Sequence, residues 1–149
     1  MRRSFWIAAS VVAALFVADR LTRSLAFDKP SRDLIGNLLR SEPTTNMGVA
    51  FGVPVPGLLM YALLLSLIVI VGVIGWTACR KQQLLAWWAT LLVFTGATSN
   101  LLDRLHYGYV RDFLQLSSWP TTANLGDWMV TVGAILLLIS SLRPSARET

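Results

Sequence analysis

Residues 99–127 read SNLLDRLHYGYVRDFLQLSSWPTTANLGD and form a polar island between two strongly apolar segments. The island holds three of the eight acidic residues of the chain: Asp103 near the end of one apolar segment, Asp127 at the start of the next, and Asp112 in the connection between them. An acidic side chain at the edge of a membrane span is costly unless it has a partner or a function. These three acids are therefore the first candidates for a functional site.

The composition indicates an integral membrane protein. Of the 149 residues, 54% are hydrophobic and only 14% are charged, and six are tryptophans, which is typical of chains that cross a bilayer. The length predicts one domain over residues 1–149, with no separate soluble domain. The net charge of +5 does not indicate nucleic-acid binding, because the arginines cluster at the ends of apolar segments, where they set topology and contact anionic lipids.

Four apolar segments predict four transmembrane helices: residues 5–27, Gly57–Ala78, Leu84–Leu102 and Gly126–Leu142. The first could instead be a cleaved signal peptide, but Phe16 occupies the position where a small residue should precede the cut. Four spans place both termini on one side of the membrane. Dense basic flanks predict that this side is cytoplasmic, namely Arg2, Arg3, Arg80, Lys81, Arg143 and Arg147.

The segment between the first two spans should lie outside the membrane. In SRDLIGNLLRSE, residues 31–42, the residues Leu34, Ile35, Leu38 and Leu39 share one helical face. This spacing predicts a short amphipathic helix, either on the membrane surface or packed against the body of the protein. TTNMGVAFGVPVPG, residues 44–57, is rich in small residues and glycine and predicts extended, turn-rich chain.

The predicted topology gathers carboxylates and amides from remote parts of the chain in one layer at the outer face. Two carboxylates close together in a partly dry site cannot both ionise cheaply, so one keeps its proton while the other acts as a base. A shared proton is what aspartic proteolysis requires. Asp112 and Asp127 are the candidate pair, although helix capping alone would also explain Asp127. The layer comprises Asp19, Asn46, Asn100, Asp103, Asp112, Asn124 and Asp127.

Other chemistries have less support. His106 is the only histidine and Cys79 the only cysteine, so a histidine-rich zinc site and an internal disulfide are excluded. No serine or cysteine lies in a recognisable nucleophile motif. A magnesium or calcium ion held by the acids remains an alternative. Asp103 and Arg104 are expected to form ion pairs or hydrogen-bonded braces, and Asp19 to cap or brace the outer loops.

Five short motifs resemble those of the lipoprotein signal peptidases, also called signal peptidase II. Asn46-Met-Gly48-Val-Ala50-Phe51 is similar to the family pattern Asn-x-Gly-x-Ala-Phe. The other four motifs resemble Asp-x-x-Thr-Lys, Asn-x-x-Asp-Arg, Val-x-Asp-Phe and Asn-x-Ala-Asp, and they begin at Asp19, Asn100, Val110 and Asn124. All five occur in the family's order, and the resemblance runs from the first to the fourth apolar segment.

The resemblance implies an aspartyl endopeptidase, free of metal and cofactor, in the bacterial inner membrane. Its active site would lie near the outer leaflet, with membrane lipids around the protein. We expect a monomer, a point that the sequence leaves open. Its substrates would be diacylglyceryl-modified prolipoproteins, cut just before the lipidated cysteine. The family fold implies four transmembrane helices, a small extracytoplasmic β-cradle and a mobile surface helix. Asp112 and Asp127 would be catalytic, and the remaining site residues would bind substrate or support the pair: Asn46, Gly48, Asn100, Asp103, Arg104 and Asn124.

Four residues depart from the family pattern. Arg23 replaces lysine, Ser99 replaces glycine, Gly126 replaces alanine, and Arg111 stands where an apolar residue is usual. If the chain is extended at Arg111, its side chain points away from Asp112. If the chain folds back there, the arginine would lower the pKa of the acid and hinder proton sharing.

Two other functions are compatible with buried acids in a membrane protein. One is a small transporter or proton-relay protein, although such proteins place polar groups near the bilayer midplane, and the second to fourth spans are apolar through their centres. The other is an inactive homologue that binds lipidated peptides. The sequence does not say which lipoproteins would be cut or which aspartate would hold the proton.

Overall fold

The computed structural model describes residues 2–48, 55, 57–117 and 119–142 and contains four helices and a four-stranded antiparallel sheet within them. The helices are α1 (Arg2–Phe27), α2 (Gly57–Arg80), α3 (Leu84–Tyr107) and α4 (Leu125–Ser141). The strands are β1 (Arg32–Ile35), β2 (Leu39–Asn46), β3 (Val110–Leu116) and β4 (Thr122–Ala123). Of the predicted motif and tail positions, Ala50, Phe51, Arg143 and Arg147 lie outside the described residues.

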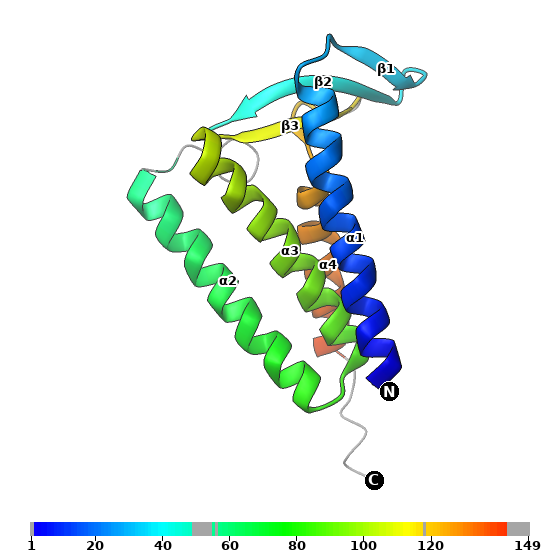
Figure 1. Cartoon of the computed structure of the whole chain (residues 1–149), viewed down its shortest axis with the longest axis vertical. Coiled ribbons are helices and arrows are strands. Elements are labelled where there is room, and N and C mark those ends of the chain that lie inside the picture. The colour runs from blue at the N-terminus through cyan, green and yellow to red at the C-terminus, as the bar shows by residue number, and fades with distance from the viewer. Residues whose placement is uncertain (1, 49–54, 56, 118, 143–149) are drawn as a thin grey trace.

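The helices run side by side and the sheet lies across one end of them (Figure 1). The start of α1 and the end of α4 lie at the opposite end. Helix α3 is central, since it contacts α1, α2 and α4. The β3–β4 segment leads directly from α3 into α4. This connection therefore carries the polar island across the same end of the helices as the sheet.

Three helices are long and apolar enough to cross a membrane: α1 from Arg3, α2 and α3. This confirms the first three predicted spans in kind, with α3 extending five residues beyond the predicted end at Leu102. Helix α4 is apolar but only 17 residues long, which corresponds to about 26 Å. The described part of the chain is therefore mostly helical, as predicted, with three clear spans and a shorter fourth helix.

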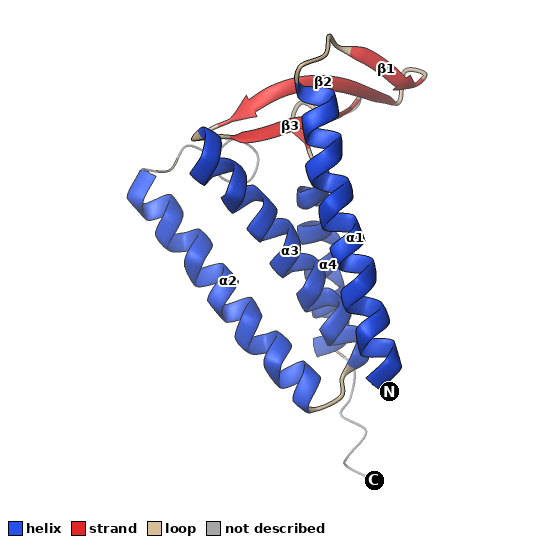
Figure 2. Ribbon diagram, in the orientation of Figure 1, coloured by secondary structure: helices blue, strands red, loops and turns tan. Residues whose placement is uncertain are grey.

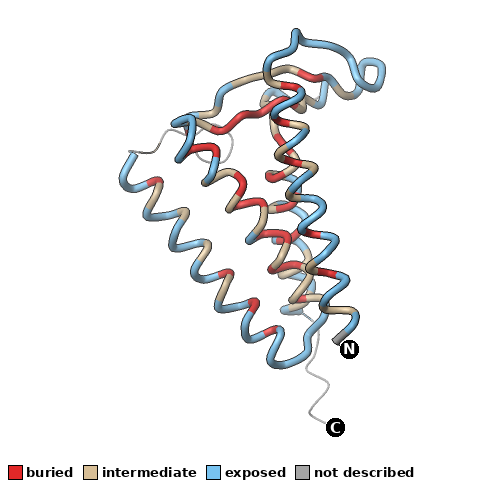
Figure 3. Tube along the Cα trace, viewed as in Figure 1, coloured by how far each residue is buried: buried red, intermediate tan, exposed pale blue. Residues whose placement is uncertain are grey.

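Much of α2 is exposed, whereas buried residues are frequent along α3 and near the sheet (Figure 3). Large apolar side chains face outward, for example Leu58, which is 86% exposed, and Trp76, which is 67% exposed. The largest fully buried side chains are mostly polar or charged, and they include Arg23, Asn124 and Asp19. Lipid solvates apolar side chains, whereas charged groups in the membrane must be paired inside the protein. The fold thus has an apolar exterior around a polar interior at the sheet end.

The helix predicted over residues 31–42 is wrong, because this segment forms the β1–β2 hairpin (Figure 2). The hairpin turns at Gly36, whose φ of +46° is unfavourable for residues with a side chain. Ile35 pairs with Leu39 across the turn. Apolar residues four positions apart can therefore face each other in a tight hairpin as well as share one face of a helix, and this is why the spacing was misleading. Pairing of β2 with β3 satisfies the backbone of residues 39–46 and favours the strand. The extended conformation predicted for residues 44–57 is confirmed over residues 44–46, and residues 49–54 and 56 of that segment lie outside the described residues.

Helices α3 and α4 approach closely at two glycines. A Cβ atom on Gly96 would overlap the carbonyl oxygen of Gly126, and one on Gly133 would lie 2.6 Å from Cγ2 of Val93. Small residues at such positions allow two backbones to pack directly. The close packing fixes the start of α4 against α3, and the candidate site lies there.

Candidate active site

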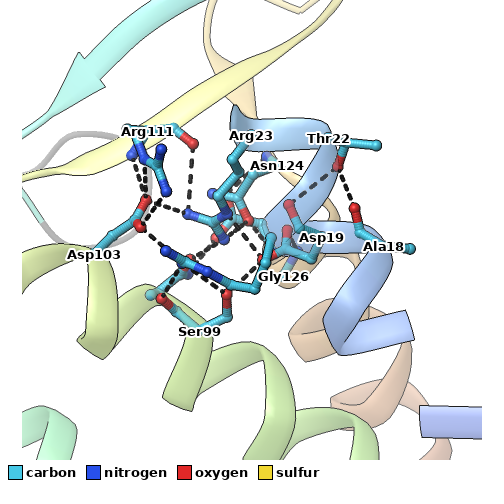
Figure 4. A network of polar contacts seen from close by, with 12 residues as sticks. Ala18, Asp19, Thr22, Arg23, Ser99, Asp103, Arg111, Asn124 and Gly126 are labelled. Carbon is cyan, nitrogen blue, oxygen red and sulfur yellow. Dashed lines mark hydrogen bonds and ion pairs between the residues drawn. The ribbon is translucent and has the colours of Figure 1, made fainter. Parts of the chain in front are cut away.

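Asp103 lies at the centre of a buried ion-pair cluster at the sheet end of the helices (Figure 4). Its carboxylate accepts hydrogen bonds from Arg20 at 2.7 Å, from Arg23 at 2.9 Å and from the Arg111 side chain at 3.0 Å. The backbone N–H of Arg111 donates to the same carboxylate. Asp103 is therefore a structural brace, as predicted, although its partners come from α1 and β3 and not from the neighbouring Arg104.

Arg23 is fully buried and uses all five N–H groups of its guanidinium. Nε donates to Asp19 at 2.9 Å, and Nη1 donates to Asp103 and to the carbonyl oxygen of Arg111. Nη2 donates to the Oδ1 atoms of Asn100 and Asn124, both at 2.7 Å. Since an arginine has five donors and no acceptor, this side chain is saturated. It joins α1 to α3, to β3 and to the residue that precedes α4.

Asp19 ties α1 to the start of α4 and to α3. Its carboxylate accepts hydrogen bonds from Arg23, from the hydroxyl of Ser99 and from the backbone N–H of Gly126. Asp19 is 0% exposed. Asp19 thus braces the structure, but its partners lie on helices and not on the outer loops as expected.

Asp112 lies on β3, is 1% exposed and accepts hydrogen bonds from two asparagine amides. Nδ2 of Asn124 donates to Oδ1 of Asp112 at 2.5 Å, and Nδ2 of Asn46 donates to Oδ2 at 3.1 Å. Asn46 comes from the neighbouring strand β2. The carboxyl is therefore held from both sides, by a residue of the sheet and by the N-cap of α4.

Asp127 lies in the first turn of α4, where it forms a capping box with Asn124. The backbone N–H of Asp127 donates to Oδ1 of Asn124 at 2.9 Å, and the backbone N–H of Asn124 donates to Oδ2 of Asp127 at 3.2 Å. Nδ2 of Asn100 donates to Oδ1 of Asp127 at 2.7 Å. The helix-capping role of Asp127 is therefore present in addition to its place in the site.

The two candidate acids lie next to each other in space. Asn124 contacts both, through its side-chain amide to Asp112 and through its backbone N–H to Asp127. Burial and the nearby charge of Asp127 raise the pKa of Asp112 from 3.8 to about 6. Such a shift means that Asp112 can hold a proton near neutral pH. Within the described residues, no group of three acidic, histidine or cysteine side chains could hold a metal ion.

Arg111 points away from Asp112, as predicted for an extended chain. It is bonded to Asp103 and stacks over the ring of Tyr107 with its Cζ atom 4.3 Å from the ring centroid. Burial by itself would lower the pKa of Arg111, but its hydrogen bonds to Asp103 and the negative charge of that carboxylate together raise the pKa. Neighbouring residues of a strand project to opposite faces, so the arginine bonds to the ion-pair cluster and not to the carboxyl group of Asp112.

Arg104 and Gly48 also meet at the site. Nη2 of Arg104 donates to the carbonyl oxygen of Gly48 at 2.5 Å, and the backbone N–H of Gly48 donates to Oδ1 of Asn46 at 3.0 Å. The hydroxyl of Tyr61 on α2 donates to the carbonyl oxygen of Arg104. Arg104 thus ties the chain after β2 to α3 and α2, which is the bracing role predicted for it.

All nine predicted site residues converge, and the structure adds others that the sequence did not single out for a role. Arg20, Arg23 and Ser99 form ion pairs or hydrogen bonds with Asp103 or Asp19 close to the two acids. One signal was available, since Asp19 and Arg23 have the i, i+4 spacing of a helical ion pair inside an apolar segment. The predicted residues are Asp19, Asn46, Gly48, Asn100, Asp103, Arg104, Asp112, Asn124 and Asp127.

The apolar helices and the buried acidic cluster define a helical integral membrane protein with a polar site at one end. Residues 11–143 match the family described as signal peptidase (SPase) II. The chain belongs to this family of bacterial membrane peptidases, as the sequence motifs predicted.

Curated relatives match nearly the whole chain. The lipoprotein signal peptidase of Syntrophomonas wolfei is 34% identical over 148 residues, which cover 97% of this chain and 96% of that protein. The lipoprotein signal peptidase of Solibacter usitatus is 31% identical and covers 93% of this chain and 92% of its own length. Neither match is confined to the site, so the similarity includes the membrane helices.

Solved structures share the fold. A bacterial membrane enzyme solved by the in meso method at 1.9 Å resolution matches with a TM-score of 0.75, at 23% identity, over 93% of this chain and 94% of that one. A second, solved at 2.3 Å, matches with a TM-score of 0.79 over 96% and 92% of the two chains. The arrangement of helices and sheet is therefore one already observed in membrane enzymes.

Proposed function

We propose that the protein is an aspartic endopeptidase that removes the signal peptide from diacylglyceryl-modified prolipoproteins by cutting before the lipidated cysteine. The observation that carries this proposal is that Asn124 donates one hydrogen bond to Asp112 and another to Asp127. A single residue thereby holds two carboxyl groups from different elements at one place. The relatives' name, lipoprotein signal peptidase, supplies the substrate class.

The chemistry requires one proton shared between the two acids. The protonated carboxyl donates a hydrogen bond to the scissile carbonyl oxygen, and the ionised one takes a proton from water. The resulting hydroxide oxygen attacks the carbonyl carbon and forms a tetrahedral intermediate. Transfer of a proton to the amide nitrogen then breaks the C–N bond, which leaves a carboxyl on the signal peptide and a free amine on the lipidated cysteine. The raised pKa of Asp112 supports this scheme.

The same proposal assigns the membrane topology. Helix α4 would be a fourth span that tilts little, because its length of about 26 Å nearly matches a hydrocarbon core of about 30 Å. The sheet would form the extracytoplasmic β-cradle over the outer leaflet of the bacterial inner membrane, with both termini in the cytoplasm. Exposed Leu38 and Ile35 on the β1–β2 hairpin are suited to contact with membrane lipids.

Cleavage of a lipidated precursor in detergent tests the proposal. We expect the unmutated protein to cut, and we expect Asp112→Asn and Asp127→Asn each to reduce the rate at least about 1000-fold, because each removes a group that handles the proton. Asp33→Asn is the matched control, since Asp33 lies on the exposed strand β1. Wild-type rates in either of the first two variants would disprove the pair. An unmutated protein that binds the precursor without cutting it would identify an inactive homologue.

A further inference from the structure

The two asparagines beside the candidate acids have a defined orientation that depends on Arg23. Nη2 of Arg23 donates to Oδ1 of both Asn100 and Asn124. A guanidinium has no acceptor, so each asparagine must turn its oxygen toward Arg23 and its NH₂ group the other way. The NH₂ group of Asn100 then meets Asp127 and that of Asn124 meets Asp112.

We propose that Arg23 is a positioning residue that sets the protonation of the catalytic pair by fixing both asparagine amides as donors to the two carboxyl groups. This inference rests on the proposed function. One buried cation thus acts symmetrically on both acids through two amides and touches neither acid. A carboxylate that accepts N–H bonds is stabilised in its ionised form, so the arrangement opposes a second proton on the pair.

Gly126 leaves the space that this arrangement needs. A Cβ atom at position 126 would lie 2.8 Å from Nη2 of Arg23 and 2.9 Å from Oδ1 of Asn124. These are two atoms of the hydrogen bond that orients Asn124. A side chain at position 126 would therefore force Arg23 or Asn124 to shift, and positions 23 and 126 should show energetic coupling.

Substitution Arg23→Lys separates the positioning role from simple charge pairing. A lysine keeps the positive charge but has three donors on one atom, so it cannot satisfy Asp19 and Asp103 and also hold both amides. A released amide can rotate its oxygen toward a carboxyl group, which is favourable only when that carboxyl is protonated. The pair would then keep both protons to higher pH. The other charged groups around the cluster remain in this variant: Asp19, Arg20, Asp103, Arg104 and Arg111.

The experiment measures kcat, KM and the pH profile of precursor cleavage for Arg23→Lys, with thermal unfolding as the check of folding. We expect kcat to fall at least about tenfold with KM changed less than about twofold. We also expect the acidic limb of the kcat profile to move upward by about half a pH unit or more. Arg20→Lys is the matched control, because Arg20 also lies on α1 and pairs with Asp103 but contacts neither asparagine; its acidic limb should stay in place.

Two further variants keep the test decisive. Gly126→Ala displaces Nη2 without removing a charge, so it should shift the acidic limb in the same direction even if Arg23→Lys fails to fold. The double variant Arg23→Lys with Gly126→Ala should lose less activity than the two single losses multiplied together. A wild-type acidic limb in the folded single variants, while Asp112→Asn and Asp127→Asn are inactive, would overturn the positioning role alone. Activity in those two aspartate variants would overturn the proposed function instead.

Discussion

The surroundings of Asp112 favour its protonated form. It is buried, it lies beside another carboxyl group, and its two asparagine donors only partly offset these effects. The folded protein therefore binds a proton at Asp112 that the unfolded chain would already have released at the same pH. This difference between the two states makes the stability of the protein depend on pH.

We expect the unmutated protein to lose stability relative to Asp112→Asn as the pH rises from about 4 to about 6. The pKa of Asp112 is raised from 3.8 to about 6 by folding, so its stabilising contribution is complete below the lower value and is lost through the higher one. The difference between the two proteins should change by roughly 2 kcal/mol over this range. Thermal unfolding in detergent at several pH values measures it, and parallel curves for the two proteins would contradict the assigned shift.

The sequence predicted which residues form the site but not all the contacts that hold them. The sequence placed seven polar residues in one layer, because the parity of the spans assigns each of them to the outer side. It did not reveal that Arg23 saturates all five donors or that Arg20 and Arg111 share Asp103 with it. Such convergence depends on how α1 is rotated against α3, and no spacing along the chain records that rotation.

At the scale of elements, the contact between α3 and α4 determines how firmly the site is held. Gly133 lies in this contact with Ala89 and Val93 of α3. The start of α4 carries Asp127, so a shift of α4 along α3 would move one of the two acids relative to the other. Packing in the apolar part of the helices should therefore matter to the polar end.

We expect Gly133→Ala to destabilise the protein by about 1–3 kcal/mol. The added Cβ would lie 2.6 Å from Cγ2 of Val93 and 2.7 Å from the carbonyl oxygen of Ala89, a backbone atom with little freedom to move. Gly72→Ala on α2 is the matched control, because a Cβ there meets no described atom within 4 Å. Thermal unfolding in detergent should show a lower midpoint for Gly133→Ala and an unchanged midpoint for Gly72→Ala. Equal midpoints for the two variants would contradict the expected cost of the added Cβ atom between α3 and α4.

The elements also differ in how well the sequence predicted them. The four helices followed from long apolar segments, and their bounds agree with the prediction to within a few residues except at the start of α1 and the end of α3. The β1–β2 hairpin was not predicted, because its apolar residues repeat at the spacing of a helix. Pairing with β3, a strand about 70 residues away in sequence, decided the outcome, and local pattern cannot reveal such a partner.

At the scale of the whole molecule, the polar end and the basic end are separated by the length of the helices. Cys79 lies near the end of α2 that is remote from the sheet and is exposed. Leu38 lies in the turn of the β1–β2 hairpin at the other end and is 72% exposed. These two positions can report which end of the molecule faces the cytoplasm.

We expect a membrane-impermeant maleimide to label Cys79 in inside-out vesicles and not in right-side-out vesicles. The basic residues Arg80 and Lys81 beside it predict a cytoplasmic position. A Cys79→Ser, Leu38→Cys variant should show the opposite pattern, and Cys79→Ser alone should remain unlabelled in both. Labelling of both positions from the same side would refute the proposed topology.

The hydrogen bonds from Gly126 to Asp19 and from Arg23 to Asn124 join residues that are 107 and 101 positions apart. Helix α1 therefore carries two charged groups whose partners lie at the start of α4, which is synthesised later. Until α4 is inserted, Asp19 and Arg23 lack part of their bonding, and Asp127 is not yet beside Asp112. Formation of the polar site is thus coupled to the insertion of α4, and α1 must enter the membrane with two buried charges that are only partly paired.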